Sequence, residues 1–191
     1  MIYSVTPQLL DMNSKQIILL VDDSEFDVLL MRAAFKKAQF HPVLQVVRNG
    51  EEAIAYLAGT GEYNDRASFP LPTLVLLDIN MPKKNGFEVL RWLRADPILK
   101  RLSVTMLTAS LRPEDVDLAF ELGANSYLVK PSNLESLADM LRTLRDWIGI
   151  NHFASVSAGN GLTIDLTTRP VGSELRMTNP LPPTAALRVG F

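Results

Sequence analysis

The chain has 191 residues, of which 47% are hydrophobic and 21% charged, and its formal net charge is −2 at pH 7. This is typical of one globular α/β domain with some additional chain, and two full domains would be cramped. The near-neutral charge gives no basic surface for direct nucleic-acid binding, and the absence of cysteine excludes disulfides and thiolate metal ligands. The apolar runs are too short for a membrane span and residues 1–12 lack the basic start of a secretory signal, so we expect a cytoplasmic location.

Short apolar runs alternate with amphipathic segments over residues 15–149. We expect these runs to be strands, and in chain order they are Ile17–Val21, Val43–Val47, Leu74–Leu77, Val104–Leu107 and Ser126–Val129. Runs of this length that are apolar on both faces are typical of parallel strands covered by helices.

Each run is followed by a segment with helical spacing. The expected helices are Phe26–Ala38, Glu51–Leu57, Gly86–Ala95, Pro113–Leu122 and a last one from Leu134 to Ile148. In the first helix, the residues expected on one apolar side are Leu29, Leu30, Ala33 and Phe35. Ser24 and Asp27 resemble a capping box at its start. The alternation predicts an α/β fold, with a five-stranded doubly wound parallel sheet and five helices.

Three stretches lie outside this pattern. Residues 1–14 form a lead without a recognisable element, and Met12 is an alternative start. Residues 58–72 form a connection longer than typical loops, either functional or decorative. Residues 150–191 are rich in Gly, Pro, Ser and Thr, and Leu162–Thr167 alternates weakly like a strand. We expect this tail to be disordered, although a partner-binding segment or a poor end to the reading frame would also fit.

Polar residues follow four of the expected strands. Asp22 and Asp23 follow the first, Asp78 the third, Thr108 the fourth and Lys130 the fifth. In a doubly wound sheet the carboxyl ends of the strands share one edge, where ligands bind. A single acidic pair is more often part of a solvated turn. Polar residues at the carboxyl ends of four strands, however, predict that these side chains share one cleft.

This cleft would hold three carboxylates, one ammonium and one hydroxyl. Carboxylates so close together raise one another's pKa unless a cation neutralises them. Oxygen ligands without Cys or a nearby His favour Mg²⁺ over Zn²⁺. Asp78 is the candidate nucleophile, because it opens the loop Ile79–Pro82 and stands apart from the acidic pair.

Four motifs occur in order, namely Val21–Ser24, Leu77–Gly86, Leu107–Ala109 and Leu128–Pro131. Together they resemble the receiver domain of bacterial response regulators over residues 15–149. Each motif alone is modest evidence, but all four at this spacing are specific. The resemblance implies a flavodoxin-like fold with strand order 2-1-3-4-5.

The resemblance also implies a role for each residue of the cleft. Asp78 would accept a phosphoryl group and would bind Mg²⁺ together with Asp23, with Asp22 through water, and with the backbone carbonyl of Asn80. Lys130 would pair with the phosphoryl group, in line with the need of phosphoryl transfer for electrostatic stabilisation.

Two further residues would form the switch. Thr108 would move its hydroxyl toward the phosphoryl group, and Tyr127 would fill the vacated space and couple the cleft to the face of the fourth helix, fifth strand and fifth helix. Pro131 matches a proline that often follows a cis bond. The plainer readings are a helix cap for Thr108, a core residue for Tyr127 and a surface lysine for Lys130.

The function implied by the resemblance is that of a phosphoacceptor response regulator in a two-component system. It would receive a phosphoryl group from a sensor histidine kinase or a phosphotransfer protein and then bind a downstream protein. It would not be an enzyme beyond self-phosphorylation and slow autodephosphorylation. The 58–72 connection resembles the extended loop of single-domain receivers, including those partnered with phytochrome-type kinases. A homodimer through the face described above is a further expectation.

Three other functions are alternatives. A phosphorylation-independent pseudo-receiver that only docks to partners is the runner-up. A metal-dependent phosphohydrolase of the haloacid-dehalogenase type would need an acid/base two residues after Asp78, where Asn80 cannot transfer a proton. A DNA-binding transcription factor would need a recognition helix and a basic face, which the tail does not offer.

Overall fold

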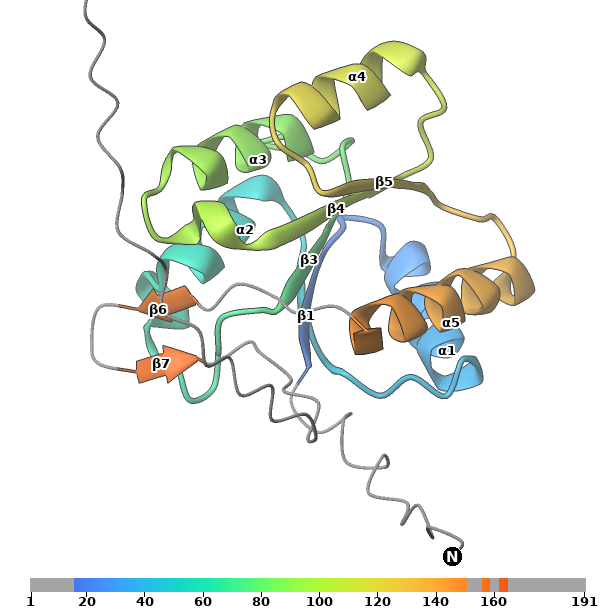
Figure 1. The fold of residues 1–191 in the computed structure, drawn as a ribbon, viewed down its shortest axis with the longest axis horizontal. Coiled ribbons are helices and arrows are strands. Elements are labelled where there is room, and N and C mark those ends of the chain that lie inside the picture. Colours follow the sequence, from blue (N-terminus) through green and yellow to red (C-terminus); the bar gives the residue numbers. More distant parts are fainter. Residues whose placement is uncertain (1–15, 151–155, 159–161, 165–191) are drawn as a thin grey trace, which may run out of the picture.

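The computed structural model describes residues 16–150 together with two short strands at 156–158 and 162–164. Its main sheet has five parallel strands in the order β2-β1-β3-β4-β5 (Figure 1). The strands are β1 (Ile17–Val21), β2 (Val43–Val47), β3 (Leu74–Leu77), β4 (Ser103–Thr108) and β5 (Ser126–Val129). The predicted strand order is confirmed, and β4 is one residue longer at each end than expected.

Helices cover both faces of this sheet. The α-helices over residues 16–150 are α1 (Glu25–Lys37), α2 (Gly50–Ala58), α3 (Gly86–Ala95), α4 (Pro113–Glu121) and α5 (Leu134–Ile150). Two short 3-10 helices, η2 (Gly61–Asn64) and η3 (Leu99–Arg101), lie in the connections. Figure 1 shows α1 and α5 side by side on one face and α2, α3 and α4 on the other. The predicted doubly wound α/β architecture is confirmed.

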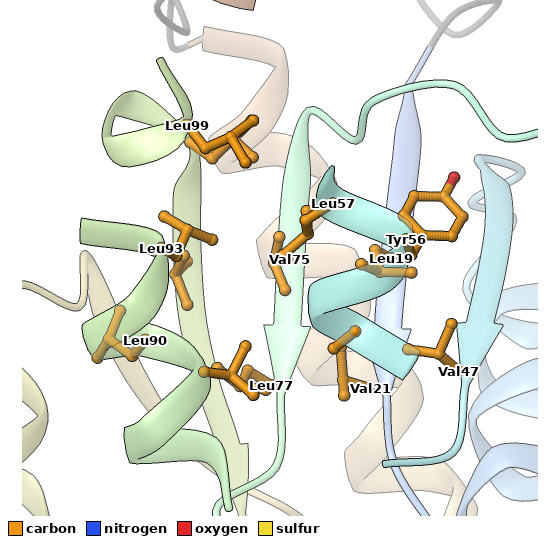
Figure 2. Close-up of a cluster of buried hydrophobic side chains, with 14 of the residues drawn as sticks. Leu19, Val21, Val47, Tyr56, Leu57, Val75, Leu77, Leu90, Leu93 and Leu99 are labelled. Carbon is orange, nitrogen blue, oxygen red and sulfur yellow. The ribbon is translucent and has the colours of Figure 1, made fainter. Parts of the chain in front are cut away.

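The core lies in two layers, one on each face of the sheet. Leu19 and Val21 of β1 belong to the cluster under α2 and α3, which Figure 2 shows, whereas Ile18 and Leu20 belong to the cluster under α1 and α5. A one-residue shift of β1 would move each set of side chains to the opposite face of the sheet. Each set is buried in its own cluster in the observed register. This double burial fixes the strand register and therefore the position of the residues that follow each strand.

The buried side of α1 differs from the expectation. Val28, Met31 and Phe35 are buried, whereas Leu29 is 60% exposed and Ala33 is exposed as well. The buried residues recur at three- and four-residue steps, the stripe that a helix turns toward one neighbour. Leu29 follows Val28 directly and so lies about 100° around the helix. The apolar side predicted for this helix was therefore wrong for Leu29 and Ala33.

The long connection after α2 is folded against that helix. The guanidinium of Arg66 donates to the carbonyls of Tyr56 at 2.7 Å and Leu57 at 2.8 Å, which lie in the last turn of α2. Carbonyls at a helix end lack partners within the helix, so Arg66 caps this end. The hydroxyl of Tyr56 donates to the carbonyl of Pro70 at 2.7 Å. The connection is thus held to α2 at Arg66 and again at Pro70.

Two strands lie in the segment expected to be a disordered tail. β6 (Val156–Ala158) and β7 (Leu162–Ile164) pair antiparallel as a small separate sheet, and β7 coincides with part of the predicted weak strand. Ile150, the first residue of that segment, ends α5. Residues 1–15, 151–155, 159–161 and 165–191 lie outside the described residues, so the expectations about them stay predictions. In the described part of the chain, none of the helices has the length and apolarity needed to cross a membrane.

Candidate functional site

Three carboxylates meet where two neighbouring strands end. Asp22 and Asp23 follow β1 and Asp78 follows β3, which pairs directly with β1. One oxygen from each of the three lies within 4.8 Å of the others. Asp22 and Asp78 are buried and Asp23 is exposed, so the group opens toward solvent on one side. The structure thus brings together the acidic residues that the sequence singled out.

Lys130, the residue directly after β5, reaches this acidic group. Its ammonium lies 2.8 Å from Asp22 Oδ2, 2.7 Å from Asp78 Oδ2 and 3.1 Å from Asp27 Oδ2. The backbone N–H of Lys130 donates to the carbonyl of Thr108 at 2.8 Å, which extends the β4–β5 pairing by one residue. This pairing directs Lys130 to the site although none of the described peptide bonds is cis. The prediction of a cis peptide bond before Pro131 was therefore wrong.

The charges of this group do not balance. Burial raises the pKa of Asp22, while the hydrogen bond and charge of Lys130 oppose that rise. Burial alone would lower the pKa of Lys130, but hydrogen bonds to Asp22 and Asp78 outweigh it and raise the pKa above the ordinary value. One cation thus contacts the carboxylates of Asp22, Asp27 and Asp78, and Asp23 belongs to the same acidic cluster. An oxygen-only cluster with excess negative charge fits a hard divalent cation such as Mg²⁺.

The loop that Asp78 opens is fixed at both ends. Asp78 Oδ1 accepts the N–H of Ile79 at 2.7 Å, and Gly86 donates its N–H to the carbonyl of Ile79 at 2.9 Å. A Cβ on Gly86 would lie 2.2 Å from the carbonyl oxygen of Asp78, so only glycine lets α3 begin this close. Asn85 caps α3. Asn80 lies in this loop with an exposed side chain, and its backbone role toward a metal stays a prediction.

Thr108 is fully buried at the end of β4 and lies at the same edge of the sheet. Its hydroxyl oxygen accepts the N–H of Ser110 at 3.3 Å, and Tyr127 donates its hydroxyl to the carbonyl of Ser110 at 3.1 Å. Ser110 in turn donates its hydroxyl to Asp115 Oδ2 at 2.5 Å. The two predicted switch residues are therefore linked through Ser110, which also reaches the first turn of α4.

Asp27 is the acidic partner of Lys130 that sequence reasoning missed. The sequence indicates only a capping role for Asp27, and half of that interpretation is confirmed because the N–H of Asp27 donates to Ser24 Oγ at 3.2 Å. In a capping box the Asp27 carboxylate would also accept the N–H of Ser24. Here that N–H donates to Asp22 Oδ1 at 3.1 Å instead. Asp27 lies in the first turn of a helix that begins just after β1, and this position is a signal that could have revealed it.

Fold and site together define the class of protein. Residues 18–142 match the response regulator receiver domain, and the chain belongs to this family. Among curated proteins, it is 39% identical over 135 residues to the response regulator Rcp1 of Synechocystis sp. (strain ATCC 27184 / PCC 6803 / Kazusa), covering 71% of this chain and 90% of Rcp1.

Two solved structures extend this similarity. One is the phosphorylated cyanobacterial phytochrome response regulator RcpA, with a TM-score of 0.64 and 35% identity, covering 70% of this chain and 94% of that one. The other is the Mn²⁺-bound form of response regulator Rcp1, with a TM-score of 0.64 and 37% identity, covering 75% of this chain and 99% of that one. The predicted resemblance to phytochrome-partnered receivers is confirmed as a similarity of sequence and fold.

Proposed function

We propose that the chain is a phosphorylation-dependent signalling switch. A sensor histidine kinase or a phosphotransfer protein transfers a phosphoryl group to Asp78 in a Mg²⁺-dependent reaction, and the modified protein changes its binding to a partner. The observation that carries this proposal is the 2.7 Å contact of Lys130 with Asp78 Oδ2 beside two further carboxylates. A carboxylate nucleophile and a fixed cation are the parts that phosphoryl transfer requires.

The residues that would hold the metal are Asp22, Asp23 and Asp78, with the backbone carbonyl of Asn80 as a further ligand. Their oxygen-only chemistry suits Mg²⁺, which is usually bound by one or two carboxylates plus phosphate oxygens and water. When bound, the ion supplies positive charge that stabilises the transferred group. The Mn²⁺-bound form of the related Rcp1 supports a divalent cation in this family.

The transfer itself is an in-line substitution at phosphorus. An Asp78 oxygen forms the new P–O bond as the bond between phosphorus and the donor breaks, and the donor atom keeps the electron pair. Lys130 compensates the charge on the phosphoryl oxygens and needs no proton transfer, because its pKa is raised. The hydroxyl of Thr108 donates to the same group after a rotation.

The switch follows from the contacts of Ser110. When the hydroxyl of Thr108 turns to the phosphoryl group, the N–H of Ser110 loses its acceptor and the loop that holds Tyr127 is released. The response spreads to the face formed by α4, β5 and α5, where Phe120 is 50% and Val129 40% exposed. A downstream protein or a second copy of the chain would bind this apolar face.

The kinase partner would approach the open side of the site. Phe26 is 69% and Leu29 60% exposed on α1, next to Asp27 at the mouth of the acidic group. Exposed apolar side chains rimmed by polar ones are typical of protein contacts. Because RcpA is a phytochrome response regulator, we expect a phytochrome-type histidine kinase in the cytoplasm.

A small phosphodonor tests the proposal without a known kinase. The chain is incubated with acetyl phosphate and Mg²⁺ or with acetyl phosphate and EDTA, and intact-mass spectrometry detects the added phosphoryl group. We expect labelling with Mg²⁺ and none in Asp78→Asn, whereas Asp117→Asn, an exposed change on α4, serves as the control. Equal labelling of Asp78→Asn would reject the proposal, and an unlabelled wild type would favour the pseudo-receiver.

A further inference from the structure

Lys130 has three carboxylate acceptors. An ammonium has three N–H donors, and those of Lys130 are matched by Asp22, Asp78 and Asp27 at 2.8, 2.7 and 3.1 Å. Only 11% of the Lys130 side chain is exposed, so these contacts define its position. Two of the acceptors come from strand ends and the third from α1.

The local structure of α1 leaves the Asp27 carboxylate available for Lys130. In a capping box the third residue of the helix would bond back to the N–H of the cap residue. That N–H, from Ser24, is already bonded to Asp22 Oδ1, whereas the Asp27 N–H is held by Ser24 Oγ. The backbone of Asp27 is thus fixed and its carboxylate turns to Lys130.

Asp27 differs from the other two acceptors in what happens to it during the reaction. Asp22 and Asp78 belong to the group of oxygens close enough to share a metal ion, and Asp27 is not a member of it. In the proposed function, Asp22 would help to hold the metal ion, and phosphorylation would convert the carboxylate of Asp78 into an acyl phosphate. Asp27 is the acceptor that both events leave unchanged.

We propose that Asp27 is a positioning residue for phosphoryl transfer, which holds one N–H of Lys130 and thereby directs the other two at the phosphoryl oxygens. This inference rests on the proposed function, in which Asp78 is the phosphoacceptor. Fixing one donor of a tetrahedral ammonium restricts its rotation, so the remaining donors are oriented before the phosphodonor arrives. Asp27 does not contact the reacting atoms and acts through Lys130.

The test uses initial rates of labelling of the full chain over a range of acetyl phosphate concentrations, with Mg²⁺. For Asp27→Asn, which keeps the shape and removes the charge, we expect a maximal rate lower by about 3–10-fold, the range expected for one charge-assisted contact that is partly exposed. The half-saturating donor concentration should not rise, because removing a negative charge does not weaken attraction of an anion. Asp27→Glu, which keeps the charge, should recover part of the rate.

Glu25→Gln is the matched control. Glu25 lies exposed in the same first turn of α1 and is not among the ion-pair partners of Lys130 within residues 16–150. Its rate should stay within about twofold of wild type, since exposed charges have small effects. In a Lys130→Met background, Asp27→Asn should cause no further loss.

The outcomes separate this inference from the proposed function. If wild type is labelled and Asp27→Asn is labelled as fast as Glu25→Gln, the inference about Asp27 is wrong and the proposed function stands. The same conclusion would follow if Asp27→Asn slowed the Lys130→Met chain as much as it slows wild type. A wild type that takes no label on Asp78 would overturn the proposed function, and the inference would fall with it.

Discussion

The ammonium of Lys130 and the carboxylate of Asp78 lie 2.7 Å apart although 52 residues separate them in the chain. The contact exists because β3, β4 and β5 run parallel and end at one edge of the sheet. It places a cation where charge on a phosphoryl group would develop.

Removing the cation should destabilise the metal-free protein. Lys130→Met leaves Asp22 and Asp78 buried without a counter-charge, so we expect the free energy of unfolding at pH 7 in EDTA to fall by about 2–3 kcal/mol, less than a fully buried pair because Lys130 is partly exposed. Urea unfolding measures this value. Lys100→Met, at an exposed position, should change it little. A Lys130 variant as stable as wild type would contradict the account of the site.

The same contact should make the free energy of unfolding depend on pH in the alkaline range. The folded-state pKa of Lys130 is raised above 10.5, so its contribution to stability is complete below that pH and is lost as pH rises through the folded value. The difference in unfolding free energy between wild type and Lys130→Met should therefore stay constant to about pH 10 and narrow above it. A difference that narrowed near neutral pH would contradict this assignment.

Mg²⁺ should stabilise the folded chain. Ligand that binds only the folded state adds about 1.4 kcal/mol at ten times its dissociation constant, so the melting temperature should rise with Mg²⁺ concentration. Asp23→Asn should abolish most of this rise, because Asp23 is one of the three clustered carboxylates. Glu62→Gln, exposed in η2, should keep it. Equal Mg²⁺ responses in wild type and Asp23→Asn would exclude this cluster as the metal site.

Gly86 should be required for the shape of the phosphoacceptor loop. In Gly86→Ala the new Cβ would lie 2.2 Å from the Asp78 carbonyl oxygen, so the backbone must shift, at a cost of about 1–3 kcal/mol in unfolding free energy. Labelling by acetyl phosphate should slow as well. Gly149→Ala places a Cβ in open space within α5 and should be neutral or stabilising by up to about 1 kcal/mol. Similar losses in both variants would contradict the close approach at Gly86.

The elements and the cleft were predictable because they follow from simple patterns. The strands of this doubly wound sheet are apolar on both faces, which marks them in the sequence, and parallel strands must end at a common edge. Asp22, Asp78 and Lys130 were therefore placed together from their positions alone. The intact receiver motifs added the strand order, which alternation of strands and helices does not determine.

The features that the sequence did not predict correctly all depend on the direction in which a side chain points. Leu29 was assigned to the core of α1 on apolar character, but the helix phase that packs against α5 and the sheet turns it outward. Asp27 was interpreted from its spacing to Ser24, whereas its carboxylate direction depends on Lys130, more than a hundred residues away in the chain. The capping role of Arg66 likewise depends on how residues 59–70 fold back onto α2.

Mapping the phosphorylated residue tests the central claim most directly. The chain is labelled by acetyl phosphate with Mg²⁺ and treated with borohydride, which reduces an acyl phosphate to the alcohol, and peptide mass spectrometry then locates the change. The account predicts reduction at Asp78. Reduction at Asp22 or Asp23 instead, with Asp78 unchanged, would contradict it.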